Sequence, residues 1–268
     1  MPALDDHALA ADLAERAGRL LLELRAQGGD PAALRNAGDR QSHEFLMAEL
    51  AKARPGDAVL SEEGVDDKAR LSADRVWIVD PLDGTREFGE PGRVDWAVHV
   101  ALWARDTPAG SGAPAGPAGS RDGDLIAGAV ALPAQGRVLS TAAPTPLTGP
   151  DAHHPLRMVV SRSRASDLVK SVAALIKAEL VPWGSAGAKV ATVVLGENDA
   201  YLHSGGFYEW DTAAPVAVAR ASGFHVSRVD GSPVAYNQED PLLPDILVCR
   251  PAIAPVLLDA IREATHAI

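Results

Sequence analysis

The spacing of apolar residues changes along the chain, and these changes predict the order of helices and strands. Near the N-terminus, leucines and alanines recur every three or four residues from about Leu4 to Arg25. This spacing predicts an amphipathic helix, and Gly28 and Gly29 would end it. A second helix of the same kind is predicted from about Ser42 to Ala53.

Short apolar runs follow, and they predict strands at residues 59–64, 76–79, 95–103, 125–131 and 137–140. Because these strands are closely spaced, we expect an antiparallel sheet. Beyond the Pro- and Thr-rich residues 144–155, helices alternate with strands: strands at 156–160, 200–202 and 246–249, and helices at 166–179, 191–195, 211–222 and from 254 on. We therefore predict an α+β unit over residues 1–150 and an α/β unit over residues 151–268.

Composition narrows the function classes. The chain has 268 residues and a net charge of −11, which argues against binding a nucleic acid polymer through a broad basic surface. A small phosphorylated substrate remains compatible with this charge, because bound cations would invert the local field. The single Cys249 excludes an intrachain disulfide. No long apolar run or basic leader is present, so we expect a cytoplasmic protein without a membrane segment.

Residues 107–120 consist almost entirely of Pro, Ala, Gly and Ser. Such a composition cannot bury a core, so these residues predict a flexible hairpin excursion. We assign no chemistry to them.

The most informative stretch runs from Val76 to Phe88 and reads VWIVDPLDGTREF. Its buried strand brings Asp80 to the strand's C-terminal end, Pro81 is expected to stop the strand, and Thr85 stands where a short helix could begin. Asp80 and Asp83 therefore flank one turn, and hard cations such as Mg²⁺ take oxygen ligands of this kind. Asp-Pro and Asp-Gly pairs are ordinary turn formers, but the full string is too particular for a turn alone.

This stretch resembles the metal-binding signature of the inositol monophosphatase superfamily, whose members are Mg²⁺-dependent, Li⁺-sensitive phosphatases. Two further signatures stand in the family's order, residues 60–64 before it and residues 209–214 after it. The resemblance implies a layered αβαβα sandwich of the inositol monophosphatase and fructose-1,6-bisphosphatase type. It also implies that residues 1–150 carry the metal site and residues 151–268 bind the substrate.

The resemblance further implies two or three Mg²⁺ ions, with ligands from Glu63, Asp80, the Leu82 carbonyl, Asp83 and Asp211. Asp80 would bridge two ions that clamp an in-line phosphoryl displacement.

Three residues have implied catalytic roles: Thr85 would position the attacking water, assisted by Glu63 and Asp39. Asp39 matches the family's place, but Asn36 and Gly38 depart from its string, and a helix-capping role for Asp39 stays open beside the catalytic one. The neighbouring Glu62 is expected either in a solvated acidic loop or in a supporting role.

Within the superfamily, the motifs most resemble the bacterial 3′(2′),5′-bisphosphate nucleotidases, which remove the 3′-phosphate from adenosine 3′,5′-bisphosphate in sulfate assimilation. The residues that carry this likeness are 85–88, 161–163, 184–189, 209 and 236–237. The implied substrate-binding residues are Gly84, Thr85, Arg162, Ser185, Lys189 and Glu209. Backbone N–H groups of Gly84 and Thr85 would bind the cleaved phosphate. Arg162 and Lys189 would hold the other one, although either could be an ordinary surface cation.

Other functions remain open at this point. The same metal site could hydrolyse inositol 1-phosphate or fructose 1,6-bisphosphate, and a non-catalytic protein that senses Mg²⁺ or nucleotides is an alternative of another class. An aspartyl-nucleophile phosphatase is excluded, because Pro81 and Leu82 separate the two aspartates and break the alternation of an Asp-x-Asp strand. The oligomeric state is not fixed by the sequence, and a homodimer is among the expected assemblies.

Overall fold

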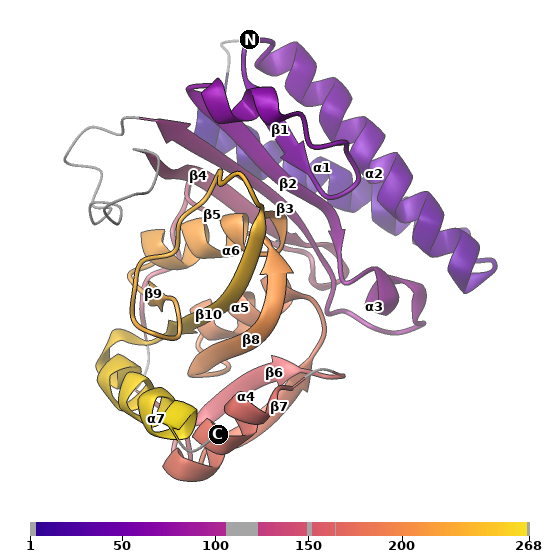
Figure 1. Ribbon diagram of the computed structural model, residues 1–268. Coiled ribbons are helices and arrows are strands. Elements are labelled where there is room, and N and C mark those ends of the chain that lie inside the picture. The colour runs from indigo at the N-terminus through magenta and orange to yellow at the C-terminus, as the bar shows by residue number, and fades with distance from the viewer. Residues whose placement is uncertain (1–3, 106–122, 149–151, 164, 267–268) are drawn as a thin grey trace.

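The computed structural model describes residues 4–105, 123–148, 152–163 and 165–266, in five alternating layers of helices and sheets (Figure 1). The predicted excursion at 107–120 lies outside these residues. The layers run from α1 and α2, through the first sheet, to α5 and α6, then the second sheet, and finally α4 and α7. This arrangement confirms the expected αβαβα sandwich. No helix among the described residues is long and apolar enough to cross a membrane.

The first sheet has the order β1-β2-β3-β4-β5, built from β1 (Ala58–Ser61), β2 (Arg75–Asp83), β3 (Ala97–Arg105), β4 (Gly123–Leu132) and β5 (Arg137–Ser140). Pairings from β2 to β5 are antiparallel as predicted, but β1 pairs parallel to β2, because the 3₁₀ turn η1 (Lys68–Ser72) lies in the crossover between them. The expectation that Pro81 stops the strand was wrong. β2 continues to Asp83 after a register shift between Asp80 and Asp83.

The middle strands of this sheet are buried on both faces, which explains their nearly continuous apolar sequence. Along β2, Trp77 and Val79 join the core against the outer helices α1 (Asp6–Ala26) and α2 (Pro31–Ala53). Val76 and Ile78 point the opposite way, into the core shared with the second sheet.

Helix α2 is longer than its predicted span. Its N-cap is Asp30, whose side chain accepts a hydrogen bond from the N–H of Ala33, and Pro31 occupies the first turn. Asp39 therefore lies inside the helix, and the alternative that it caps a helix was wrong.

The second sheet is mixed and has the order β7-β6-β8-β10-β9: β6 (Arg157–Ser161), β7 (Glu179–Trp183), β8 (Ala200–Tyr208), β9 (His225–Ser227) and β10 (Leu242–Cys249). Of these, β7 and β9 were not predicted. The helix expected to reach Glu179 ends at Ile176, because Lys177 takes a left-handed conformation and Glu179 already begins β7.

The remaining helices are α3 (Thr85–Gly89), α4 (Asp167–Ile176), α5 (Ala186–Val194), α6 (Glu209–Ala221) and α7 (Ala254–His266), with 3₁₀ turns η2 (Pro133–Gln135) and η3 (Pro251–Ile253). Helices α5 and α6 lie between the sheets, and one apolar core joins them to both (Figure 1). Ile78 of the first sheet and Val248 of the second belong to that same core. The division into two domains at about residue 150 stays a prediction.

Candidate active site

A cavity of about 290 Å³ opens where the end of β2 meets the first residues of α5 and α6. Its lining divides by charge. One side, here called the acidic wall, consists of Glu62, Asp80, Asp83 and Asp211. A second group of lining residues, here called the basic wall, consists of Arg162, Ser163, Ser185 and Lys189, and the lining also includes the aromatic rings of Trp183, Tyr201, His203 and Phe207.

Each aspartate of the acidic wall uses one carboxylate oxygen to accept a main-chain hydrogen bond. The N–H of Leu82 donates to Oδ1 of Asp80 at 3.0 Å, and the N–H of Gly187 donates to Oδ2 of Asp83 at 2.7 Å. Oδ2 of Asp211 accepts from the N–H of the residue that caps α6, at 2.7 Å. These bonds orient the three side chains from two elements, β2 and α6, toward one cavity.

Crowding of carboxylates shifts their pKa values. Burial, together with Glu62 and the other two aspartates, raises the pKa of Asp80 well above its usual value. Burial and Asp83 raise the pKa of Asp211 to about 6, and loss of hydration together with Asp211 raises that of Glu62 at the rim to about 7. Burial and mutual repulsion outweigh the nearby positive charges at these carboxylates, and carboxylate oxygens are the donors that Mg²⁺ prefers. The acidic wall therefore fits a divalent cation.

Asp83 differs from its neighbours because positive and donor groups surround it. Burial alone would raise its pKa, but His99, Lys189 and Ser185 together hold the pKa below its ordinary value. The hydroxyl of Ser185 donates to Oδ2 of Asp83 at 2.5 Å. Asp83 is thus the carboxylate of this wall that the protein itself keeps ionised.

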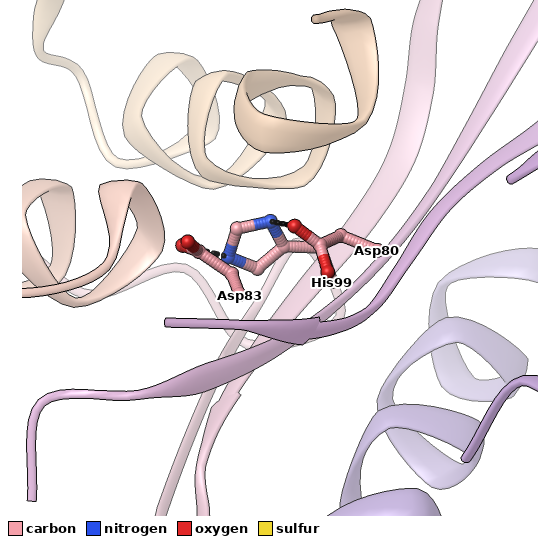
Figure 2. Close-up of side chains that lie close together, drawn as sticks. All are labelled: Asp80, Asp83 and His99. Carbon is pink, nitrogen blue, oxygen red and sulfur yellow. Dashed lines mark ion pairs between the residues drawn. The ribbon is translucent and has the colours of Figure 1, made fainter. Parts of the chain in front are cut away.

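Sequence reasoning missed His99, a fully buried residue of β3 (Figure 2). Its Nε2 lies 3.2 Å from Oδ2 of Asp83, and its Nδ1 lies 4.0 Å from Oδ2 of Asp80. Burial lowers the pKa of His99, but Asp83 and the carbonyl of Trp210 outweigh this and raise it above the ordinary value. The available signal was a polar residue in the otherwise apolar run AVHVAL.

The two adjacent glutamates face different neighbours. Glu62 lines the cavity with the three aspartates, whereas the expected ligand Glu63 is not among the described residues that line it. Burial and the nearby Glu63 raise the pKa of Asp39 to about 6. The structure therefore groups Glu62 with the aspartates and Glu63 with Asp39.

Thr85 lies between the expected metal ligands and Asp39. Its hydroxyl oxygen is 3.2 Å from Oδ1 of Asp39 and 3.1 Å from the carbonyl oxygen of Leu82. Gly84, which precedes Thr85, has a φ of 86°, a left-handed conformation that favours glycine. The turn thereby places both Gly84 and Thr85 on the cavity.

One face of α2 makes hydrogen bonds to the segments that carry the acidic wall. Asp39, Ser42 and His43 stand three and four residues apart, so they share that face. The buried Ser42 donates from its hydroxyl to the carbonyl of Pro81 at 2.7 Å, and Nδ1 of His43 lies 3.0 Å from the hydroxyl of Ser61. Helix α2 thus makes hydrogen bonds to the ends of β1 and β2, which lead into or carry the acidic residues.

On the basic wall, Lys189 is 5% exposed and borders the cavity. Its Nζ donates to the carbonyl of Ser185 at 2.6 Å and lies 5.3 Å from the ring centre of Tyr201. Burial lowers its pKa to about 8. Asp83, Glu87 and Asp211 favour its charged form, but no carboxylate of the described residues lies within ion-pair distance of its Nζ.

Arg162 also faces the cavity, but two carboxylates already bind it. Its guanidinium donates to Glu87 at 2.8 Å and to Glu90 at 2.8 Å and 2.9 Å. These bonds, chiefly those to Glu90, raise the pKa of Arg162, and the same contact lowers the pKa of Glu90 to about 2. A substrate phosphate would have to compete with these carboxylates.

Glu209, an expected substrate contact, lies elsewhere. It is 1% exposed, and its two carboxylate oxygens accept from the N–H groups of Asn237 and Gln238 at 2.7 Å each. It is not among the described residues that line the cavity. In this position Glu209 ties the start of α6 to the loop before β10.

Comparison with known proteins places these features in context. The inositol monophosphatase family model matches residues 8–266. The chain is 51% identical to the 3′-phosphoadenosine 5′-phosphate phosphatase of Mycobacterium leprae over 97% of this chain and 94% of that protein. It is 31% identical to the 3′(2′),5′-bisphosphate nucleotidase CysQ of Escherichia coli, over 77% of this chain and 81% of that protein. The crystal structure of CysQ from Bacteroides thetaiotaomicron superposes with a TM-score of 0.72 at 27% identity and covers 91% of this chain and 96% of that one.

Proposed function

The chain belongs to the inositol monophosphatase family, and from this premise we propose that it removes the 3′-phosphate from adenosine 3′,5′-bisphosphate to give AMP and phosphate. The observation that carries the proposal is the pairing of an acidic wall with the buried Lys189 in one cavity. The acidic wall can bind the cations that a phosphate needs for its cleavage, and Lys189 can bind a second phosphate that is not cleaved. The names of the similar phosphatases support the same substrate.

We place Mg²⁺ on the acidic wall, held by Asp80, the Leu82 carbonyl, Asp83, Asp211 and a glutamate from the loop after β1. Bound there, Mg²⁺ supplies charge neutralisation for the attacking and leaving oxygens of an in-line displacement. Glu63 was the expected glutamate, but Glu62 shares the cavity with the aspartates. Glu62 is therefore the stronger candidate.

The protein's own groups then have separate tasks. The Thr85 hydroxyl, held between Asp39 and the Leu82 carbonyl, is placed to orient a water for attack on phosphorus. Asp39, whose pKa burial raises to about 6, can accept the proton of the attacking water through Thr85 as the new P–O bond forms, and the departing 3′-oxygen takes a proton from solvent water as its bond to phosphorus breaks. The N–H groups of Gly84 and Thr85 bind oxygens of the phosphate being cleaved.

Substrate choice is assigned to the basic wall. Lys189 would pair with the 5′-phosphate, since its ammonium borders the cavity and has no carboxylate bound to it among the described contacts. Arg162 would contribute only if the phosphate displaces Glu90, which is partly exposed at 34% of its side chain. The hydroxyl of Ser185 donates to Asp83, so we assign Ser185 to connecting the two walls instead of binding the substrate.

The test is phosphate release from adenosine 3′,5′-bisphosphate, 3′-AMP, inositol 1-phosphate and fructose 1,6-bisphosphate, each with Mg²⁺ and with excess chelator. We expect the nucleotide bisphosphate to give the highest kcat/KM and the chelator to abolish activity. A clear preference for inositol 1-phosphate or fructose 1,6-bisphosphate would overturn the substrate assignment. Absence of hydrolysis of all four would favour a sensing protein.

A further inference from the structure

His99 occupies a position that ordinarily suits an apolar side chain. It lies on β3 between Ala97 and Ala101, whose side chains pack in the core shared by both sheets. Strand residues two apart share a face, so the imidazole points into that core, and it is 0% exposed. Burying an imidazole there is costly unless its nitrogens find partners. The contacts that it makes should therefore explain its presence.

Those contacts include Asp80 and Asp83 (Figure 2), and a third contact is with the residue that precedes Asp211. His99 is the direct cross-strand neighbour of Asp80 in the β2–β3 ladder. Its Nε2 lies 3.2 Å from Oδ2 of Asp83, from the strand end that follows. Its Nδ1 lies 3.1 Å from the carbonyl oxygen of Trp210, which immediately precedes Asp211 in α6. One ring thus bridges β3, the end of β2 and the first turn of α6.

The ring is also fixed in place. A Cβ atom added to Gly187 would lie 2.0 Å from Nε2, so the start of α5 packs directly against the imidazole. Asp83 on one side and Gly187 on the other leave Nε2 facing protein atoms, and Nδ1 is taken by Trp210. Asp80, Asp83 and His99 lie close enough together to share a metal ion, and Nε2 makes no well-aligned hydrogen bond among the described residues. The protein contacts on both sides of the ring nevertheless favour His99 as a support for the carboxylates.

We propose that His99 is a positioning residue that holds Asp80, Asp83 and Asp211 at the separation needed to bind divalent cations together. The Asp83 carboxylate, aligned by His99 on one side and by the first turn of α5 on the other, keeps its free oxygen toward the cavity. The Trp210 carbonyl, aligned by the same ring, fixes the first turn of α6 and hence Asp211. This inference rests on the metal site of the proposed function, but not on its substrate.

Three substitutions separate the two contacts. The side-chain amide of asparagine reaches the place of Nδ1, so His99→Asn can keep the bond to Trp210 and loses the contact with Asp83. Glutamine reaches the place of Nε2, so His99→Gln does the reverse. His99→Leu removes both. The matched control is His153→Leu, which breaks another histidine–aspartate pair, the 2.9 Å contact of Nδ1 of His153 with Asp199, away from the cavity.

The readout is Mn²⁺ binding to the substrate-free protein, measured by electron paramagnetic resonance, with thermal unfolding recorded in parallel. Loss of a group that orients metal ligands typically weakens metal affinity about ten- to hundredfold. We expect a loss of this size in His99→Leu, smaller losses in His99→Asn and His99→Gln, and wild-type affinity in His153→Leu. If His99→Leu does not fold, the other two variants decide.

Folded His99 variants that bind Mn²⁺ as tightly as the wild type would overturn the proposal while leaving the proposed function intact. Nitrogen hyperfine coupling from His99 in the wild-type Mn²⁺ spectrum would also overturn it, since the residue would then be a ligand. If the wild type binds Mn²⁺ and the variants bind it weakly, but no nucleotide is hydrolysed, this inference stands and the proposed function fails. A wild type that binds no Mn²⁺ would remove the metal site and the inference together.

Discussion

The two walls of the cavity carry opposite charges, and they also differ in how far neighbouring groups already neutralise those charges. Carboxylates of the acidic wall crowd together, and the pKa values of Asp80, Asp211 and Glu62 are raised in consequence. Glu87 and Glu90 already neutralise Arg162, and Arg86, which also lines the cavity, pairs with Glu90. Lys189 is left as the lining cation with no carboxylate within ion-pair distance among the described residues. The difference implies that the acidic wall binds cations, whereas the basic wall binds one phosphate through the ammonium group of Lys189.

The largest effect should follow from removing charge on the acidic wall. Asp83→Asn and Asp211→Asn keep side-chain size but lose a ligand charge, so we expect turnover at saturating Mg²⁺ to fall by more than the ten- to hundredfold typical of outer-shell partners. Folding, measured by circular dichroism, should survive. The matched control is Asp167→Asn, because that aspartate is 91% exposed in α4. Wild-type turnover in either site variant would show that the carboxylate is not a ligand.

The two glutamates offer an intermediate test of which side chains belong to the acidic wall. Because Glu62 and not Glu63 lines the cavity, Glu62→Gln should raise the Mg²⁺ concentration for half-maximal activity about tenfold or more. Glu63→Gln should change it less and should act mainly through Asp39. The measurement is activity against Mg²⁺ concentration for both variants. A larger shift in Glu63→Gln would restore the assignment made from the sequence.

A smaller effect should appear with pH on the basic wall. Burial lowers the pKa of Lys189 from 10.5 to about 8, so the ammonium loses its proton as the pH rises through that value. The KM for adenosine 3′,5′-bisphosphate should therefore rise up to about fivefold between pH 8 and pH 9, since the charged fraction falls from about a half at the pKa to about a tenth one pH unit above it. The KM for 3′-AMP, measured in parallel, should stay nearly flat.

Loss of folded protein would not explain a rise in KM between pH 8 and pH 9. A lysine with a lowered pKa binds fewer protons in the folded state than in the unfolded state between pH 8 and 10.5. Its contribution to the free energy of unfolding therefore increases with pH across that window. Parallel losses on both substrates would argue against a role for Lys189 in binding the second phosphate.

Most of the fold could be predicted from periodicity, and the exceptions have physical causes. Helix α1 and the long strands β2 and β3 carry regular apolar spacing and lie close to their predicted places. The first part of α2 was missed because its residues 31–41 bury few side chains, and its start depends on the Asp30 cap. The edge strands β7 and β9 were missed because the burial that marks a strand is incomplete there.

The site was predicted less evenly. Asp80, Asp83 and Asp211 belong to motifs, and the structure brings their side chains to one cavity. Which of two neighbouring glutamates turns inward depends on the loop after β1, and no local pattern encodes it. Glu209 looked free to bind substrate, yet two backbone N–H groups occupy its carboxylate. The role of His99 follows from a cross-strand register and a helix start that are distant in sequence.

The most direct test of the division between the walls is the specificity of Lys189→Met, because methionine keeps the aliphatic stem of the buried side chain and removes its charge. A charge-assisted hydrogen bond contributes about 1.5–3 kcal/mol, or roughly ten- to hundredfold in kcat/KM. The measurement is kcat/KM for adenosine 3′,5′-bisphosphate and for 3′-AMP in the wild type and the variant. The account predicts a loss of that size on the bisphosphate alone. Equal losses on both substrates would contradict it, because Lys189 would then support the fold or the metal site instead of the second phosphate.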